Sequence, residues 1–137
     1  MDRISENTRI AELTPDECWP LLQSQVLGRL AVRTDTGVDI FPVNYLVHDS
    51  AVFFRTAPGS KMMDLTKEPQ VAFESDGRTG QRYWSVVMHG AAQRLSSDAE
   101  IEESGVMTLR TWSATEKFNY VRIVPTTITG RRFLRQF

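Results

Sequence analysis

The residues best suited to binding chemistry in this sequence lie between positions 55 and 61. Arg55 and Thr56 end a predicted strand, and Gly59, Ser60 and Lys61 follow at the start of a predicted helix. A phosphate group is bound by backbone N–H groups at a helix N-terminus, by hydroxyl groups and by cations. This stretch offers all of these donors and is therefore a candidate phosphate site. On spacing alone, a capped surface helix with solvated cations explains the pattern at least as well.

A second candidate lies upstream, where a proline interrupts a predicted strand. Pro42 cannot donate to a strand ladder, and Val43, Asn44 and Tyr45 follow it. Backbone groups freed by this interruption can hydrogen-bond the edge of a heteroaromatic ring, and the Tyr45 ring can pack near its face. A strand bulge with a partly buried tyrosine is the purely structural alternative.

The other residues with chemical potential have no suitable partners in the sequence. His48 and His89 lack neighbours at metal-ligand spacing, so we expect no metal site. Cys18 follows two acidic residues, which would not activate a thiol, and we interpret it as a buried side chain. Trp84 and Ser85 begin a strand, where aromatic residues usually fill a core or an interface. No glycine-rich nucleotide loop or Gly-x-Ser-x-Gly elbow occurs, and no residue marks a catalytic acid or base.

The composition is that of an ordinary globular domain. The chain has 137 residues, of which 41% are hydrophobic and 24% are charged, and we expect a single domain over residues 1–137. Sixteen Lys and Arg against seventeen Asp and Glu give a net charge of −1, which counts against a nucleic-acid-binding protein. No apolar run is long enough for a membrane span, and no secretory signal is evident. We therefore expect a cytoplasmic protein that binds neither nucleic acid nor membrane.

Three short helices are predicted. Thr14 and Glu17 form a capping box that opens a helix toward Gln25, with Pro20 deep enough inside to shorten or kink it. Ser60 can cap a second helix over residues 61–67, and a capping box at residues 97–100 opens a third, which ends near residue 105. Residues 1–13 show no clear periodicity and are interpreted as an N-terminal arm or a loosely docked segment.

The rest of the pattern predicts strands. Pro42 favours an edge strand or a bulge, and Gly90 favours a bulge or bend inside a long strand. Strands are expected at residues 26–34, 38–47, 51–56, 70–75, 83–95 and 118–124, with 126–133 as an extension of the last. Six or seven strands with short helices, and without alternating strands and helices, predict a mainly β fold: an antiparallel β-barrel with helical caps.

Taken together, these segments resemble the pyridoxamine 5'-phosphate oxidase-like family of FMN-binding split β-barrel proteins. The resemblance covers about residues 20–133 and rests on the order and spacing of several short motifs. These lie at residues 27–31, 41–45, 53–56, 59–61, 71–74 and 84–90, with weaker matches at 121–125 and 128–132.

The resemblance implies a split barrel that forms homodimers, with one FMN in each of two clefts at the dimer interface. The segment that would line the isoalloxazine ring, largely through its backbone, consists of Pro42, Val43, Asn44 and Tyr45. Arg55 and Thr56 would reach the ribityl chain and phosphate, and Ser60 with Lys61 would complete the phosphate site. Trp84 and Ser85 match a strand that flanks the cleft.

The sequence also departs from the family's name-giving enzymes. It is shorter, and it lacks their substrate-phosphate residues near the C-terminus, for which Arg131 and Arg132 are only a partial substitute. Oxidation of vitamin B6 is therefore not supported. The resemblance implies a flavin-dependent oxidoreductase that transfers hydride or electrons to a small molecule. The alternatives are a reductase that uses the deazaflavin F420 and a non-catalytic flavin carrier or sensor.

Overall fold

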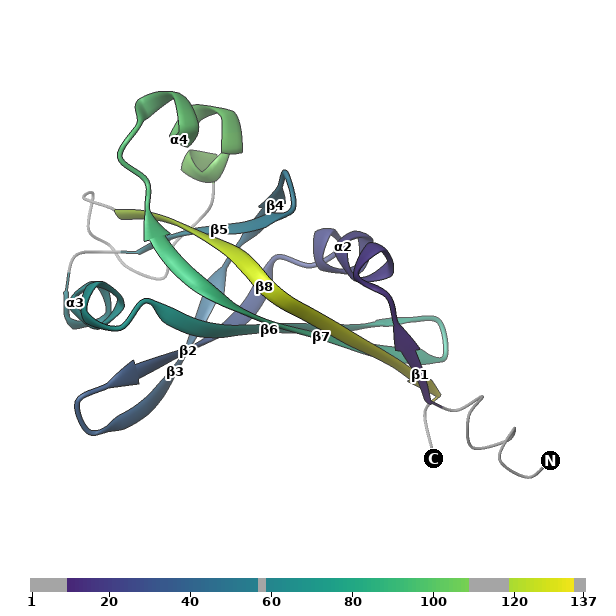
Figure 1. The fold of residues 1–137 in the computed structure, drawn as a ribbon. Helices are drawn as coiled ribbons and strands as arrows, with labels where there is room; N and C mark the ends of the chain where they lie inside the picture. Colours follow the sequence, from purple (N-terminus) through teal and green to yellow (C-terminus); the bar gives the residue numbers. More distant parts are fainter. Residues whose placement is uncertain (1–9, 57–58, 109–118, 135–137) are drawn as a thin grey trace.

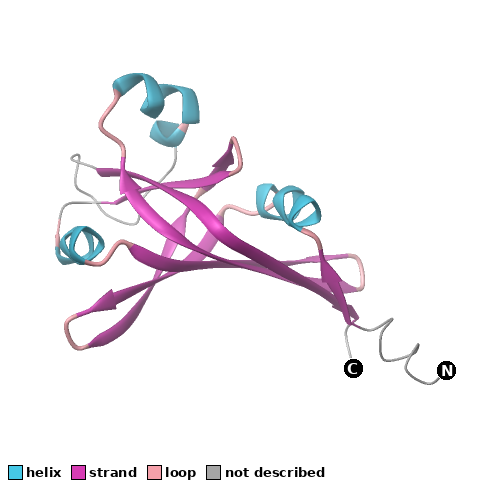
Figure 2. Ribbon diagram, viewed as in Figure 1, coloured by secondary structure: helices cyan, strands magenta, loops and turns pink. Residues whose placement is uncertain are grey.

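The structure is a computed structural model that describes residues 10–56, 59–108 and 119–134, apart from the side chains of residues 60–63 and 108. One strongly curved antiparallel sheet dominates it, with helices at its margins (Figures 1 and 2). The strands are β1 (Ile10–Leu13), β2 (Leu27–Thr34), β3 (Gly37–Asn44), β4 (Leu46–His48), β5 (Ala51–Thr56), β6 (Gln70–Thr79), β7 (Arg82–Arg94) and β8 (Asn119–Leu134). The helices are α2 (Pro15–Gln23), α3 (Ser60–Lys67), α4 (Asp98–Ser104) and the 3₁₀ turn η1 (Val106–Thr108).

The sheet confirms the mainly β split-barrel prediction. Seven strands follow the order β3-β2-β6-β7-β8-β5-β4, and β1 pairs with β8. All of these pairs are antiparallel. The long strands β6, β7 and β8 run side by side across the molecule, and the shorter strands curl away from them (Figure 1). A sheet that curls on itself buries one face without a second sheet.

Three segments differ from the sequence-based expectation. The strand expected over residues 38–47 is divided at Tyr45 into β3 and β4. Residues 10–13 of the expected arm form β1, which pairs with β8 along its full length; a four-residue segment shows too little periodicity to reveal such pairing. The strand expected over residues 70–75 is longer than predicted, since β6 extends to Thr79 and turns tightly into β7. Cross-strand pairing with β7 overrides the low strand propensity of this polar stretch. Residues 1–9 lie outside the described part of the chain.

Proline and glycine act in the sheet as their chemistry predicts. Pro42 lies in β3, which ends the strand order, so its missing N–H costs no ladder bond inside the sheet. The predicted bulge at Gly90 is confirmed by a register shift between His89 and Gly90. A Cβ atom on Gly90 would lie 2.4 Å from the carbonyl oxygen of Val124. Only glycine allows β7 and β8 to approach this closely.

The predicted caps at Thr14 and Ser97 are present, whereas the predicted cap at Ser60 is wrong. The capping box of α2 is present: the Thr14 hydroxyl accepts from the Glu17 N–H at 3.3 Å, and the Glu17 carboxylate accepts from the Thr14 N–H at 2.9 Å. Pro20 is accommodated inside α2. At α3 the cap is Gly59 rather than Ser60, which is the first helical residue. The third helix, α4, ends at Gly105 in the left-handed conformation (φ 77°), as predicted.

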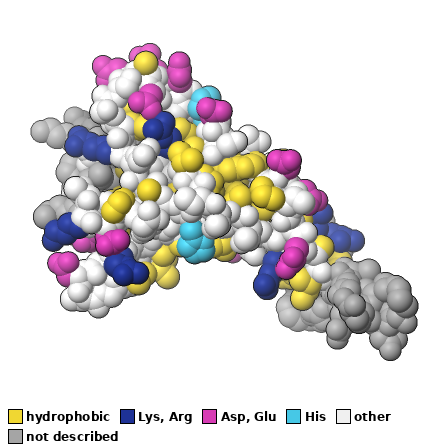
Figure 3. Space-filling model, in the orientation of Figure 1, with side chains coloured by type: hydrophobic (Ala, Val, Ile, Leu, Met, Phe, Trp, Pro, Cys, Tyr) yellow, Lys and Arg dark blue, Asp and Glu magenta, His cyan; other side chains and the backbone are white. Residues whose placement is uncertain are grey.

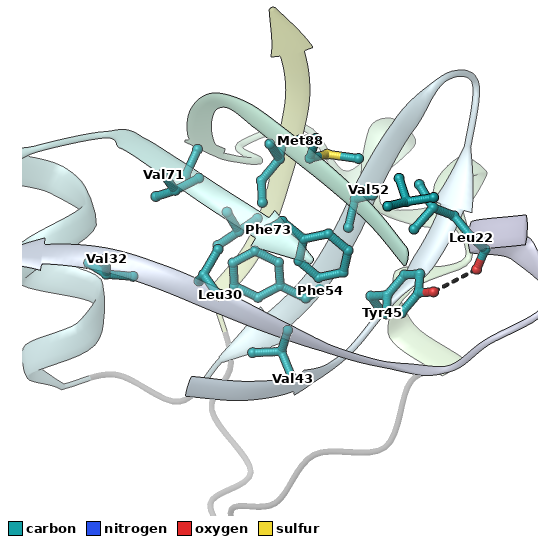
Figure 4. Close-up of a cluster of buried hydrophobic side chains, with 14 of the residues drawn as sticks. Leu22, Leu30, Val32, Val43, Tyr45, Val52, Phe54, Val71, Phe73 and Met88 are labelled. Atoms are coloured by element: carbon teal, nitrogen blue, oxygen red, sulfur yellow. Dashed lines mark hydrogen bonds between the residues drawn. The ribbon is translucent and has the colours of Figure 1, made fainter. Parts of the chain in front are cut away.

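The main core lies inside the curl of the sheet, and a tyrosine anchors it to α2. The Tyr45 ring is 1% exposed and meets Phe73 edge-on, with ring centroids 4.9 Å apart. Its hydroxyl donates to the carbonyl oxygen of Leu22 at 2.6 Å (Figure 4). Burial raises the pKa of Tyr45 to about 12, so the phenol remains a neutral donor. This bond fixes the bend between β3 and β4 against α2.

Replacing Tyr45 by phenylalanine tests this anchor. Tyr45→Phe keeps the ring but removes the short hydroxyl bond to the Leu22 carbonyl, which retains a longer bond from the Gln25 N–H at 3.3 Å. We expect the free energy of unfolding to fall by about 1 kcal/mol. Chemical denaturation would measure the change. The matched control is Tyr83→Phe, at a partly exposed residue, which should change stability by much less. Equal stability of Tyr45→Phe and the wild-type protein would contradict the anchoring role.

Candidate functional site

The curved sheet has two faces, and the two-residue period of its strands assigns each side chain to one of them. Along β2, Gly28, Leu30 and Val32 are buried on the side of the main core, and Arg29 and Ala31 point to the opposite side. We call that opposite side the outer face. Register partners on neighbouring strands share a face, so outward residues form rows across the sheet.

The predicted ring-binding segment is divided between these two faces. Val43 and Tyr45 are buried in the main core, at 4% and 1% exposure, and the Tyr45 ring is occupied by its contacts with Phe73 and Leu22. Pro42 and Asn44 lie on the outer face, at the rim formed by β3. A ligand on that face would therefore meet the side chains of Pro42 and Asn44, whereas the Tyr45 backbone N–H donates to the carbonyl oxygen of Val26 at 3.0 Å.

Exposed apolar side chains accompany Pro42 on this part of the outer face. Leu27, Val38 and Ile40 are 39%, 64% and 68% exposed, and all three are register partners of outward residues on the neighbouring strand. We call these three residues the rim patch. Figure 3 shows hydrophobic side chains through the middle of the face turned toward the viewer, with charged side chains nearer its margins. The rim patch offers exposed apolar side chains beside an edge strand.

The predicted phosphate residues lie at the junction of β5 and α3. Thr56 is buried, and Arg55 points to the opposite side of β5, where its Nη1 donates to the carbonyl oxygen of Met107 in η1 at 3.2 Å. Ser60 and Lys61 occupy the first turn of α3; the predictions for their side chains lie outside the described residues. The structure thus puts Arg55 beneath a small second core that α4 and η1 form over β5.

The last predicted pair, Trp84 and Ser85, also alternates between the faces. Trp84 is 2% exposed in the main core, and Ser85 lies on the outer face of β7. Ser85 is the register partner of Arg131, and the two residues line a groove of about 510 Å³ together with Val87 and Thr129. In the strand order, β7 is three positions from β3, so Ser85 does not adjoin Asn44 within one chain.

An ion-pair cluster on the outer face was missed by the sequence analysis. Arg29 Nη1 lies 2.7 Å from Glu74 Oε1, and Arg29 Nη2 lies 3.7 Å from Asp76 Oδ1. Burial raises the pKa of Glu74, and Asp76 raises it further, whereas Arg29 opposes the shift. The sequence carried only a weak signal for this cluster. Charged residues alternate with buried ones along both strands, which is also the pattern of an ordinary solvent-exposed face. We call these three residues the Arg29 cluster.

Three further residues with chemical potential are the two histidines and Cys18. Within the described residues, no group of three or more His, Cys, Asp or Glu side chains is placed to hold a metal ion. His48 packs edge-on against Phe53, with ring centroids 6.1 Å apart. Cys18 is fully buried, and burial raises the pKa of its thiol. Across the described ranges, no helix is both long and apolar enough to cross a membrane.

Comparison with known proteins gives a consistent set of relatives. A family model described as pyridoxamine 5'-phosphate oxidase matches residues 14–132. An uncharacterised protein of Mycobacterium tuberculosis is 40% identical over 88 residues, which are 64% of this chain and 80% of that protein. The FAD binding protein from Mycobacterium smegmatis is 38% identical, covering 92% of this chain and all of that chain, with a TM-score of 0.77. A Corynebacterium glutamicum structure, also 38% identical, gives a TM-score of 0.82 and covers 94% of this chain and 96% of its own.

The raised pKa of Glu74 predicts a pH dependence of stability. A carboxyl group with a higher pKa in the folded than in the unfolded chain binds more protons when folded, so stability falls as pH rises through that range. The range begins at the ordinary glutamate pKa of 4.5 and extends upward. Glu74→Gln removes the ionisable carboxyl group and with it this pH-dependent loss of stability. As the pH rises above 4.5, the free energy of unfolding of the wild-type protein should therefore decline relative to that of the variant.

Denaturant titrations from about pH 4 to about pH 8 would measure both curves. Glu102→Gln, at an exposed residue of α4, is the control and should leave the pH profile of the wild-type protein unchanged. Parallel curves of unfolding free energy against pH for Glu74→Gln and the wild-type protein would contradict the prediction, because the Glu74 carboxyl would then have the same pKa in the folded and unfolded chain.

Proposed function

The chain belongs to the pyridoxamine 5'-phosphate oxidase family, and from this premise we propose that it binds a flavin on the outer face at the rim of β3 and acts as a flavin-dependent oxidoreductase. The observation that carries the proposal is the similarity to the FAD binding protein from Mycobacterium smegmatis, which is 38% identical over nearly the whole chain. The isoalloxazine, ribityl and phosphate groups are common to FMN and FAD. The proposal concerns this shared part, with FMN as the first candidate.

The residues at the rim fit an isoalloxazine ring. The faces of this ring are apolar, and its pyrimidine edge carries both hydrogen-bond donors and acceptors. The rim patch supplies exposed apolar surface. The edge strand β3 supplies backbone groups, because in the described part of the sheet it pairs only with β2. The ring would lie against Pro42 and Asn44 and bond to the backbone of residues 42–45.

The phosphate group would be held at the start of α3. Ser60 and Lys61 in the first helical turn would supply a hydroxyl and a cation, together with the backbone N–H groups there. Arg55 would exchange its hydrogen bond with the Met107 carbonyl for the phosphate, and Thr56 would contact the ribityl chain. A bound flavin supplies hydride and electron transfer, while the protein supplies binding, orientation and electrostatics.

We propose a homodimer with the cofactor at the interface, in which Trp84 and Ser85 of β7 flank the cleft. The outer face supports this arrangement, since it exposes the apolar rim patch and also Val124 on β8, which is 50% exposed. Ser85 lies too many strands from Asn44 to complete the same cleft from one chain, whereas a second copy would bring its own β7 close. An F420-dependent reductase and a non-catalytic flavin carrier are the alternative functions.

Flavin titration is the direct test of this function. Purified protein titrated separately with FMN and with FAD should show saturable binding of at least one of them in the visible absorbance spectrum. Turnover of a nicotinamide donor with an electron acceptor would then separate an oxidoreductase from a carrier. A protein that binds neither flavin would contradict the proposal, and binding of F420 in its place would identify the alternative cofactor.

Removal of either proposed phosphate cation should weaken flavin binding. We expect Arg55→Ala and Lys61→Ala each to lower the affinity for FMN more than tenfold, or about 1.4 kcal/mol, because a charge-assisted hydrogen bond is lost. The control is Arg33→Ala, at an exposed arginine on β2 that should leave the affinity unchanged. Unchanged affinity in both test variants would refute the phosphate assignment. Thermal unfolding would check that Arg55→Ala retains its fold without the Met107 bond.

The oligomeric state can be measured independently of the cofactor. Size-exclusion chromatography with light scattering should give a dimer at micromolar concentration. Ile40→Asp places a charge on the rim patch and should shift the protein toward the monomer, because a buried unpaired charge is costly. Thr36→Asp, in the exposed turn between β2 and β3, is the control and should stay dimeric. A monomeric wild-type protein would contradict an interfacial cofactor.

A further inference from the structure

The Arg29 cluster adjoins the strand against which the flavin ring is proposed to bind. Arg29 is the register partner of Pro42 on one side and of Glu74 on the other. Neighbouring strands lie about 4.8 Å apart. A ring against the outward side of Pro42 would therefore have Arg29 on the adjacent strand and the two carboxylates on the strand beyond it. Arg55, the other candidate cation, lies beneath η1 instead.

The charges of this cluster are held in place and only partly hydrated. The side chains of Arg29, Glu74 and Asp76 are 44%, 29% and 52% exposed. The short Arg29–Glu74 contact of 2.7 Å fixes the guanidinium beside β6, so its position is defined before any ligand arrives. The raised pKa of Glu74 has burial as its first cause, which indicates an environment less polar than water. Charges in such an environment act on a neighbouring group more strongly than fully solvated ones.

We infer that the Arg29 cluster sets the reduction potential of a flavin bound at the rim of β3, with Arg29 stabilising the reduced form and Glu74 opposing it. This inference rests on the proposed flavin site. Uptake of two electrons and one proton by the oxidised ring leaves one negative charge on its pyrimidine side. A fixed positive charge nearby favours that state and raises the potential, and a fixed negative charge lowers it. Arg29 and Glu74 thus act through their fixed charges and donate no proton to the ring.

The cluster allows the charge to be changed in both directions at one place. It carries one positive and two negative groups, a net charge of −1. Arg29→Gln makes the local charge more negative, and Glu74→Gln makes it neutral. The double variant Arg29→Gln/Glu74→Gln returns it to the wild-type value with both side chains altered. A purely structural role would not produce shifts of opposite sign that cancel in the double variant.

The experiment measures the midpoint potential of the bound flavin by slow chemical reduction against reference dyes, in the wild-type protein and each variant. Arg29→Gln should bind the reduced flavin at least tenfold less tightly relative to the oxidised flavin, which lowers the two-electron potential by about 30 mV. Glu74→Gln should raise it, and the double variant should lie near the wild-type value. Arg29→Lys keeps the charge and should largely restore the potential. Arg33→Gln, the same charge change farther along the outer side of β2, is the matched control.

The outcomes separate this inference from the proposed function. If the wild-type protein binds no flavin, both are overturned. If flavin binds with normal affinity but Arg29→Gln and Glu74→Gln leave the potential unchanged, or shift it no more than Arg33→Gln does, only the inference on the Arg29 cluster is overturned. Should Arg29→Gln fail to fold, Arg29→Lys and Glu74→Gln still test the inference. A flavin potential that Glu74→Gln leaves unchanged contradicts the role of the Arg29 cluster.

Discussion

The pairing register of β7 with β6 and β8 is the constraint on which the rest of the structure depends. Because side chains alternate along a strand, a slip of one residue would exchange the inner and outer faces. Trp84, Val86 and Met88 would then leave the core, and Ser85 and Val87 would enter it. The close approach of Gly90 to Val124 and the bulge beside it hold this register where β7 turns over the core.

The same alternation gives one strand two separate tasks. Along β3, Val43 packs into the main core while Pro42 and Ile40 remain at the surface. Tyr45 then secures the end of this strand by its bond to Leu22. An edge strand with a proline is normally a weak part of a sheet. Here it is supported from inside by the core and by α2, while Pro42 and Ile40 stay exposed on its outer side.

Charge on the outer face is grouped rather than evenly spread. The Arg29 cluster lies at one end of the β2–β6 pairing, and Arg122 bonds Glu100 and Gln93 where α4 covers the sheet. Exposed pairs of this kind contribute little to stability. Their effect on a neighbouring ligand is larger, because a fixed charge beside a reacting ring acts on every change in that ring's charge.

The sequence by itself determined the fold class, the α2 capping box, the edge position of Pro42, the bulge at Gly90 and the family, since each depends on local patterns or motif order. Only the tertiary structure decided which predicted residues share a face. It separated Val43, Tyr45 and Trp84 from Pro42, Asn44 and Ser85, and it brought Arg29 to Glu74 across 45 positions of the chain. It also paired β1 with β8. Such long-range pairings follow from strand order and register, which local periodicity does not specify.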